Sequence, residues 1–199
     1  MNYGKQPPSK WAGMEITVSP TALEGVLVVD TDFFRDERGF FIESYNDEQF
    51  ARHGINAQFV QDNHSGSARG VLRGLHYQDM TVPMGKLVRC TSGSIFDVAV
   101  DIRVGSPTFG RWVGIDLTAD NMRQLWIPPG FAHGFATTSD HAEVQYKCSG
   151  RYAPAAEGSL AWNDPDLAIA WPISDPMVSR RDAQGMTLRE YLQRPAFRF

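Results

Sequence analysis

The side chains best suited to chemistry in this sequence are a histidine, a tyrosine and a lysine. His76 lies in residues 69–78, RGVLRGLHYQ, and an imidazole is the side chain whose proton moves near neutral pH. Tyr146 lies in residues 143–147, EVQYK, where a phenol can act as a general acid. Lys86 opens a further apolar run and can supply a positive charge, and Arg73 can meet an anionic ligand. Each of these residues, taken alone, is more often an ordinary core or surface residue.

The histidine spacing argues against a metal centre. A metal-binding jelly roll offers two histidines one residue apart, followed by a carboxylate and a later histidine. No His-x-His pair occurs in this chain, so we expect no bound metal, and a metal-dependent cupin oxygenase or isomerase is a minor alternative. The two cysteines, Cys90 and Cys148, form no CxxC pair and are expected to be buried thiols in a reducing compartment.

Short strands separated by turns must position these groups. Strand patterns cover residues 26–29, 39–45, 86–91, 94–103, 111–117, 123–127 and 143–149, with no alternation of strands and helices. The pair at residues 92–93 predicts a tight hairpin turn. In residues 69–78, strand alternation predicts that the side chains of Arg73 and His76 point to opposite faces of the strand. The strand at residues 39–45 mixes aromatic and polar residues, as a strand lining a cavity does.

The strand at residues 94–103 has two different faces. Asp97 and Asp101 share one face, which we expect to meet something polar. Phe96, Val98 and Val100 share the other, which we expect to pack between sheets. Two short helices are predicted, at residues 47–53 after an Asn46 cap and at residues 187–193. The pattern therefore favours an all-β sandwich or barrel.

Composition sets the broad class of the protein. A length of 199 residues suits one domain, with residues 1–14 expected to form a flexible arm and residues 179–199 a helical tail. Hydrophobic residues make up 42% of the chain. The formal charge is -4, so the chain has no general positive potential that would attract nucleic acid. No signal peptide or run of 18 apolar residues is visible, so we expect no membrane association and a cytoplasmic location.

Taken together and in order, a set of segments resembles the dTDP-4-dehydrorhamnose 3,5-epimerase family. The matching pieces are residues 36–41, 59–65, 71–78, 85–90, 96–103, 106–110, 124–128, 130–135, 146–147, 157–159, 162–164 and 171–172. The resemblance spans residues 24–183, and the ordered set is far more specific than any single piece. It implies a cupin-type jelly-roll β-sandwich with a few short helices, paired as a homodimer and using no metal or organic cofactor.

The resemblance also implies a dTDP-4-keto-6-deoxyhexose substrate and a proton-transfer mechanism. The C4 ketone acidifies the hydrogens on C3 and C5, so a base can leave an enolate and an acid on the opposite ring face can invert the centre. By motif match, His76 is the base, Asp182 its acidic partner and Tyr146 the acid. Lys86 matches the group near the enolate oxygen.

Further family positions match residues that hold the nucleotide and sugar. These are Arg38, Glu43, Gln61, Asp62, Asn63, Arg73, His133, Glu157 and Arg181. Arg38 and Glu43 are expected to reach across the dimer, and Arg181 stands where many members have lysine. Relatives that invert only C3 or only C5 in antibiotic-sugar pathways keep the same His and Tyr, so a mono-epimerase remains an alternative. A non-catalytic sugar-nucleotide-binding jelly roll is a second, weaker one.

Overall fold

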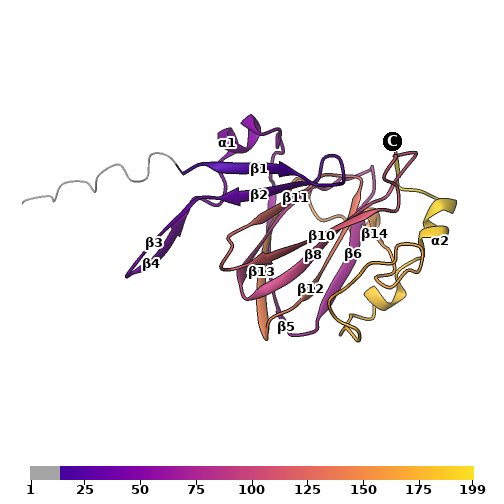
Figure 1. Ribbon diagram of the computed structural model, residues 1–199. Helices are drawn as coiled ribbons and strands as arrows, with labels where there is room; N and C mark the ends of the chain where they lie inside the picture. The colour runs from indigo at the N-terminus through magenta and orange to yellow at the C-terminus, as the bar shows by residue number, and fades with distance from the viewer. Residues whose placement is uncertain (1–13) are drawn as a thin grey trace, which may run out of the picture.

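The computed structural model describes residues 14–199 and builds them around two β-sheets (Figure 1). The larger sheet contains β1 (Ile16–Pro20), β2 (Leu27–Thr31), β11 (Gln124–Ile127), β7 (Lys86–Ser92), β13 (His141–Cys148) and β5 (Gln61–Ala68), in that order. The smaller contains β10 (Trp112–Thr118), β8 (Ser94–Asp101), β12 (Phe131–Thr137), β6 (Leu72–Gln78) and β14 (Glu157–Ser159). Neighbouring strands in both sheets are antiparallel, which confirms the expected all-β jelly roll. The arm expected at residues 1–14 falls almost entirely on residues 1–13, outside the described part.

An apolar core lies between the two sheets. Val88 and Val144 from the larger sheet pack in one buried cluster with Ile95 and Phe135 from the smaller sheet. Burying each such side chain contributes about 1.5–3 kcal/mol, so this layer holds the sheets face to face. Both cysteines are free and buried, as expected.

The hairpin predicted at residues 92–93 is wrong. Residues 86–92 form β7 in the larger sheet, whereas residues 94–101 form β8 in the smaller one, so the two strands do not pair. Gly93 has φ +72°, a conformation that favours glycine, and a Cβ at this position would collide with the carbonyl oxygen of His141. This glycine therefore carries the chain from one sheet to the other.

Of the two expectations for β8, the polar one is confirmed, because Asp97 contacts His133 and Asp101 accepts from Arg103. The expectation that the Val98 and Val100 face packs between the sheets is wrong. Ile95 and Ala99, on the Asp97 face, point into the core between the sheets, and the Val98 and Val100 face does not. That second face is instead covered by the chain after β14, in a cluster that includes Leu160, Leu167, Leu188, Tyr191 and Phe197. A third layer, visible at the yellow end of the chain in Figure 1, thus packs on the outside of the smaller sheet.

The helices are short, and their caps are local. Helix α1 (Asp47–Arg52) begins after Asn46, whose side chain accepts from the Gln49 amide, and helix α2 (Leu188–Gln193) begins with a capping box at Thr187. The tail also contains the 3-10 turn η2 (Asp182–Gln184) and β15 (Phe197–Arg198), which pairs with β9 (Arg103–Val104). A further 3-10 turn, η1 (Pro154–Ala156), precedes β14. Within residues 14–199, no helix is long and apolar enough to cross a membrane.

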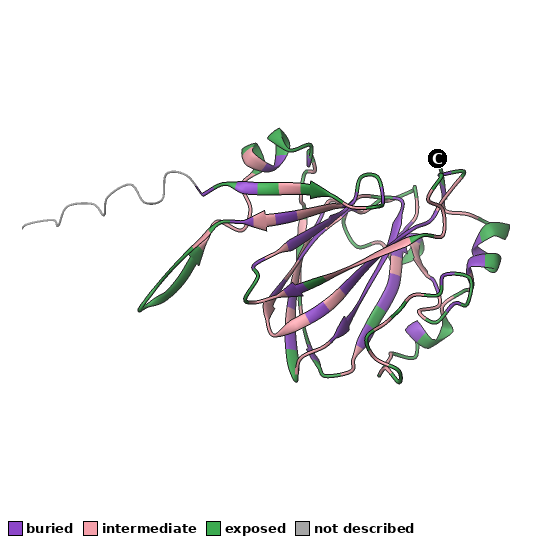
Figure 2. Cartoon of the chain, viewed as in Figure 1, coloured by how far each residue is buried: buried purple, intermediate pink, exposed green. Residues whose placement is uncertain are grey.

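One hairpin stands away from the body of the molecule. Among the strands of the described residues, β3 (Phe33–Asp36) and β4 (Gly39–Ile42) pair only with each other, and they project outward, as Figure 1 shows. Most of this hairpin is exposed (Figure 2), including Phe34, Phe40 and Phe41 at 41%, 57% and 48% of their surfaces. No residue of the strand expected at residues 39–45 lines the pocket that holds His76, Lys86 and His133. Ser44 lines a neighbouring pocket beside Tyr146, so the expectation that this segment lines a cavity is confirmed only in part.

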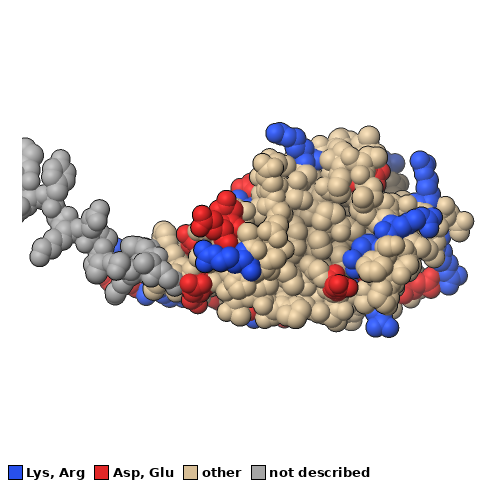
Figure 3. All heavy atoms as spheres, turned by 90° about the horizontal axis from the view of Figure 1, so that it is seen from above, with Lys and Arg blue, Asp and Glu red and all other residues tan. Residues whose placement is uncertain are grey.

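Charged side chains of both signs are scattered over the molecule. On the face seen in Figure 3, lysine and arginine groups stand apart from each other, with acidic groups and uncharged surface between them. This face offers no continuous basic surface of the kind that holds a polyanion.

Candidate active site

A cavity of about 470 Å³ opens between the sheets and gathers most of the candidate groups. It is lined by side chains of β5, β6, β7, β12 and β13, among them His76, Lys86, His133 and Tyr146. A larger hollow of about 840 Å³ lies beside α1, but it contains none of these four residues. The smaller cavity is therefore the candidate active site.

His76 is held by a buried carboxylate. Its Nε2 lies 2.6 Å from Oδ1 of Asp182, which is 4% exposed and lies at the start of η2. Burial acts to raise the pKa of Asp182, but hydrogen bonds from His76 and Ser179 outweigh it, so the pKa is lowered and the carboxyl is ionised. An ionised carboxylate accepts, so Nε2 carries the proton and Nδ1 keeps its lone pair.

The imidazole itself is neutral at neutral pH. The pKa of His76 is lowered from its ordinary value, chiefly because burial disfavours the imidazolium, with Lys86 acting in the same direction and Asp182 against it. A neutral imidazole with a free Nδ1 can accept a proton, which is what a general base requires.

Tyr146 comes from the opposite sheet. It lies on β13 in the larger sheet, whereas His76 lies on β6 in the smaller one, and both side chains line the same cavity. The pKa of Tyr146 is raised, chiefly by burial, so the phenol keeps its proton at neutral pH. The cavity thus holds a neutral base on one wall and a neutral acid on the other.

Lys86 and His133 form a second polar group in this cavity. The Nζ of Lys86 lies 3.5 Å from Nδ1 of His133, and Nε2 of His133 lies 2.8 Å from Oδ1 of buried Asp97. Because the ammonium only donates, Nδ1 accepts and Nε2 donates to the carboxylate. Burial lowers the pKa of Lys86. Sequence reasoning placed Asp97 on a polar face but did not include it in the site; a carboxylate within an otherwise apolar strand was the available signal.

A β-bulge brings Arg73 to the same side of β6 as His76. His76 pairs with His133 and Arg73 with Phe135, so two residues of β6 stand opposite Gly134 alone. The extra residue reverses the alternation, and both Arg73 and His76 line the cavity. The simple alternation expected from the sequence, which placed them on opposite faces, is therefore wrong.

The mouth of the cavity carries residues from the loop after β13. Tyr152, 53% exposed, donates its hydroxyl to Oε2 of Glu157 at 3.1 Å, and Arg181 binds the same oxygen at 2.9 Å. Gln61 and Asn63, from β5, line the wall beside them. Glu157, Arg181, Gln61 and Asn63 were expected in the site. Tyr152 was not, because a tyrosine in a loop segment gives no periodic signal.

Three expected residues do not line this cavity of their own chain. The side chain of Arg38 is 79% exposed in the β3–β4 hairpin and pairs with Asp36. Glu43 accepts instead from Gln49 at 3.4 Å. Asp62 points to the other face of β5, where its carboxylate binds Lys147 at 3.1 Å. Strand alternation explains why the Asp62 side chain points away from the cavity, since Gln61 and Asn63 on either side of it face the cavity.

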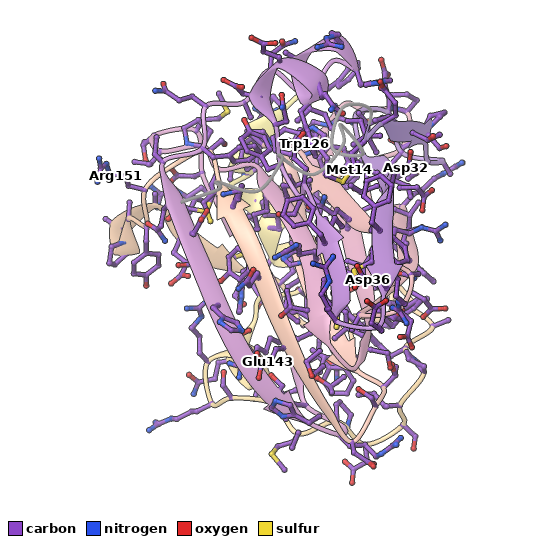
Figure 4. All side chains as sticks on the ribbon, turned by 90° about the vertical axis from the view of Figure 1, so that its left-hand side faces the viewer. Met14, Asp32, Asp36, Trp126, Glu143 and Arg151 are labelled. Carbon is purple, nitrogen blue, oxygen red and sulfur yellow. The ribbon has the colours of Figure 1, made fainter. Side chains whose placement is uncertain are left out.

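The outer face of the larger sheet carries a separate polar group. Figure 4 looks onto this face, where Glu143 is labelled. His64 and His141 contact its carboxylate at 3.0 and 3.6 Å, and all three side chains are largely exposed. In the described range 14–199, no three His, Cys, Asp or Glu side chains are placed to hold a metal ion.

The fold and the cavity define a class of protein. Two antiparallel sheets enclose a cavity that holds a histidine–aspartate pair on one wall, a buried tyrosine on the other and an ammonium between polar partners. This is a cupin-type jelly roll equipped for proton transfer.

Comparison with known proteins agrees with this class. The family model described as dTDP-4-dehydrorhamnose 3,5-epimerase matches residues 20–190. The dTDP-4-dehydrorhamnose 3,5-epimerase of Salmonella typhimurium is 54% identical over 177 residues, 88% of this chain and 97% of that protein. The dTDP-4-dehydrorhamnose 3-epimerase of Streptomyces niveus is 41% identical over 86% of this chain and 83% of its own length.

A solved structure has the same fold over nearly the whole chain. The dTDP-6-deoxy-D-glucose-3,5-epimerase of Legionella pneumophila, in complex with dTDP-4-keto-L-rhamnose, superposes with a TM-score of 0.89 at 44% identity. The match covers 93% of this chain and 99% of that one. The chain belongs to the dTDP-4-dehydrorhamnose 3,5-epimerase family.

Proposed function

We propose that this chain, an isomerase that acts on dTDP-sugars, inverts both C3 and C5 of a dTDP-4-keto-6-deoxyhexose. The observation that carries the proposal is the pairing of a neutral His76, held by Asp182, with a protonated Tyr146 on the opposite wall. A base and an acid on opposite sides of one cavity are what inversion of a carbon acid requires.

Each inversion proceeds through an enolate. The Nδ1 of His76 removes the proton from the carbon next to the C4 ketone, and the electron pair of that C–H bond moves onto O4. The ammonium of Lys86 stabilises the resulting oxyanion, because a fixed charge in a cavity with little water interacts strongly. Tyr146 donates its proton to the opposite face of the carbon, and O4 returns to the ketone. Proton exchange with solvent then returns His76 to the neutral imidazole and Tyr146 to the protonated phenol.

The nucleotide diphosphate needs positive charge at the mouth of the cavity. Arg73 and Arg181 line it, and arginine binds phosphate oxygens with a planar pair of donors. We assign sugar and nucleotide contacts to these arginines and to His133, Gln61, Asn63 and Glu157. Asp62, which binds Lys147 away from the cavity, has no such support.

Arg38 and Glu43 act in this proposal on the cavity of a second copy of the chain. Support for a homodimer comes from the projecting β3–β4 hairpin, which exposes three phenylalanines next to Arg38. Exposed apolar groups of this size commonly mark an interface. We also assign the enzyme to the cytoplasm, since its two buried thiols are unpaired and suit a reducing compartment.

A mono-epimerase is the second candidate, because one relative is named a 3-epimerase. Proton NMR in heavy water with dTDP-4-keto-6-deoxyglucose separates the two. Deuterium entering at both C3 and C5 is the expected result. Deuterium at one carbon alone would mean a mono-epimerase, and no exchange at either would contradict the proposed function.

A further inference from the structure

A directed series of hydrogen bonds runs from the mouth of the cavity inward through Gln61 and Asn63 to Cys148. The backbone N–H of Tyr152 donates to Oε1 of Gln61 at 3.0 Å. The Nε2 of Gln61 donates to Oδ1 of Asn63 at 3.1 Å, and the Nδ2 of Asn63 donates to Sγ of Cys148 at 3.6 Å. Every polar atom in this series belongs to the larger sheet or to the loop after it.

The direction of this series is set at its outer end. A backbone N–H can only donate, so the oxygen of the Gln61 amide must face Tyr152 and its nitrogen must face Asn63. The same reasoning makes the Asn63 oxygen the acceptor and turns its NH₂ group inward. Neither amide can rotate by 180° without placing two donors or two acceptors against each other, which costs more than the hydrogen bond that is lost.

The inward NH₂ group of Asn63 lies beside the candidate acid. Asn63 and Tyr146 are direct partners in the antiparallel pairing of β5 with β13, and both side chains line the cavity. A hydrogen bond from Asn63 acts against the effect of burial and favours the ionised phenol, so the amide donates and the phenol oxygen accepts. A phenol has one hydrogen of its own, and it is then free to point toward the ligand.

We propose that Gln61 and Asn63 are positioning residues that direct the proton of Tyr146 into the cavity and stabilise the phenolate left after proton transfer. This rests on the proposed function, in which Tyr146 returns the proton to the sugar. The amides do not exchange protons with the substrate in this role. They ensure that the phenol oxygen accepts from the protein and donates to the ligand.

The test separates proton removal from proton return. In heavy water, His76 can return deuterium to the face from which it took the proton, so labelled substrate of unchanged configuration reports removal alone. In Asn63→Asp, a carboxylate replaces the NH₂ donor. It accepts a hydrogen bond from the phenol of Tyr146, and its negative charge opposes formation of the phenolate. We expect the ratio of inverted product to labelled, uninverted substrate to fall by about tenfold or more, in the direction of Tyr146→Phe.

Two further variants define the outcome. Gln61→Glu still accepts from Tyr152 but cannot donate to Asn63, so it should lower the same ratio by a smaller factor. Gln145→Glu makes the same chemical change next to Tyr146, but its side chain binds Arg89 away from the cavity, and the ratio should not change. Circular dichroism of each variant checks folding.

The proposal is overturned if inversion and labelling fall together in Asn63→Asp and Gln61→Glu, or if neither changes. Equal losses would mean that the amides only hold the substrate or the loop. Failure of the proposed function gives a different result, since the unmodified enzyme would then exchange no hydrogen at C3 or C5.

Discussion

At the scale of single residues, one physical cause prepares both the base and the acid. Burial disfavours the charged form of any group, so it lowers the pKa of His76 and raises the pKa of Tyr146. Both side chains are neutral at neutral pH, which leaves the imidazole able to accept a proton and the phenol able to donate one. The same cavity therefore supplies opposite functions without any other charged group having to impose them.

Replacement of His76 tests the base directly. We expect His76→Asn to lose about 10²–10⁴-fold in kcat, because the amide cannot accept the proton at the position of Nδ1. The fold should survive, since His76 is only partly buried and asparagine is smaller. Turnover measured by product NMR, alongside thermal unfolding, checks both statements. Full activity in this variant would contradict the assignment.

The role of Asp182 is visible in the pH profile. The pKa of His76 lies below that of an ordinary imidazole, so the acidic fall of kcat/KM should occur at lower pH than for an exposed histidine base. Asp182 acts to raise the pKa of His76, so this pKa should fall further in Asp182→Asn. The acidic limb of the profile should then move to still lower pH, and the maximal kcat/KM should be lower. Asp166→Asn, which removes a carboxylate that binds Arg189 at the surface, serves as the control and should leave the profile unchanged. A limb that moves to higher pH in Asp182→Asn would refute this account.

At the scale of elements, the bulge between β6 and β12 decides which side chains enter the cavity. Gly74 has φ +130°, and a Cβ there would lie 2.5 Å from the Cα of Gly134. The two backbones thus approach more closely than any side chain allows. This contact maintains the bulge, and the bulge turns Arg73 toward the cavity.

Gly74→Ala should therefore lower both stability and activity. Gly70→Ala is a matched control, because Gly70 also has positive φ (+80°) but open space around it. We expect Gly70→Ala to cost about 1 kcal/mol from backbone conformation alone, and Gly74→Ala to cost clearly more. Denaturant unfolding gives the two free energies, and steady-state kinetics gives the effect on activity. Equal costs would show that the close approach contributes nothing.

The turn after β8 is stabilised by a buried carboxylate. Asp101 accepts from Arg103, Ser106 and Thr108. Although burial acts to raise its pKa, these hydrogen bonds bring it down to about 2.

This depressed pKa gives a signed dependence of stability on pH. Below its ordinary pKa the unfolded carboxyl binds a proton that the folded one resists, so the stabilisation is present above about pH 4 and is lost toward about pH 2. We expect Asp101→Asn to lose about 2 kcal/mol at neutral pH and to show a weaker acid dependence. Asp140→Asn, at an exposed ion pair, should change neither. Urea unfolding between pH 2 and 7 is the measurement.

At the scale of the whole molecule, the β3–β4 hairpin is the element that projects from the two sheets. Within residues 14–199 it pairs with no other strand, it exposes three phenylalanines, and it holds Arg38 away from the cavity of its own chain. In the homodimer that we propose, each copy completes the site of the other.

Mixing two inactive variants tests this arrangement. Arg38→Ala lacks the group that would be lent, and His76→Asn lacks the base. After subunit exchange, half of the dimers are mixed, and each has one complete site, so about a quarter of the activity of the unmodified enzyme should return. Sedimentation of the unmodified protein measures its mass in solution. A monomer, or a mixture without recovery, would rule out a shared site.

The sequence alone was enough for features that depend on near neighbours. Asn46 and Thr187 begin the two helices because each cap bonds an amide three residues away. Ordered motifs indicated the family and brought His76, Tyr146, Lys86 and Asp182 forward as candidates. The chemistry of these side chains is a property of the residues themselves, so it could be read before any fold was known.

The tertiary structure decided which groups meet. The sequence suggested that residues 86–91 and 94–103 form one hairpin, but burial of both strands placed them in different sheets, with Gly93 between them. Only the pairing of β6 with β12 creates the bulge that turns Arg73 inward, and only the pairing of β8 with β12 puts Asp97 beside His133. Only the approach of the two sheets brings Tyr152 to the cavity. Alternation and capping act over a few residues, whereas sheet partners and a shared cavity depend on contacts between residues far apart in the chain.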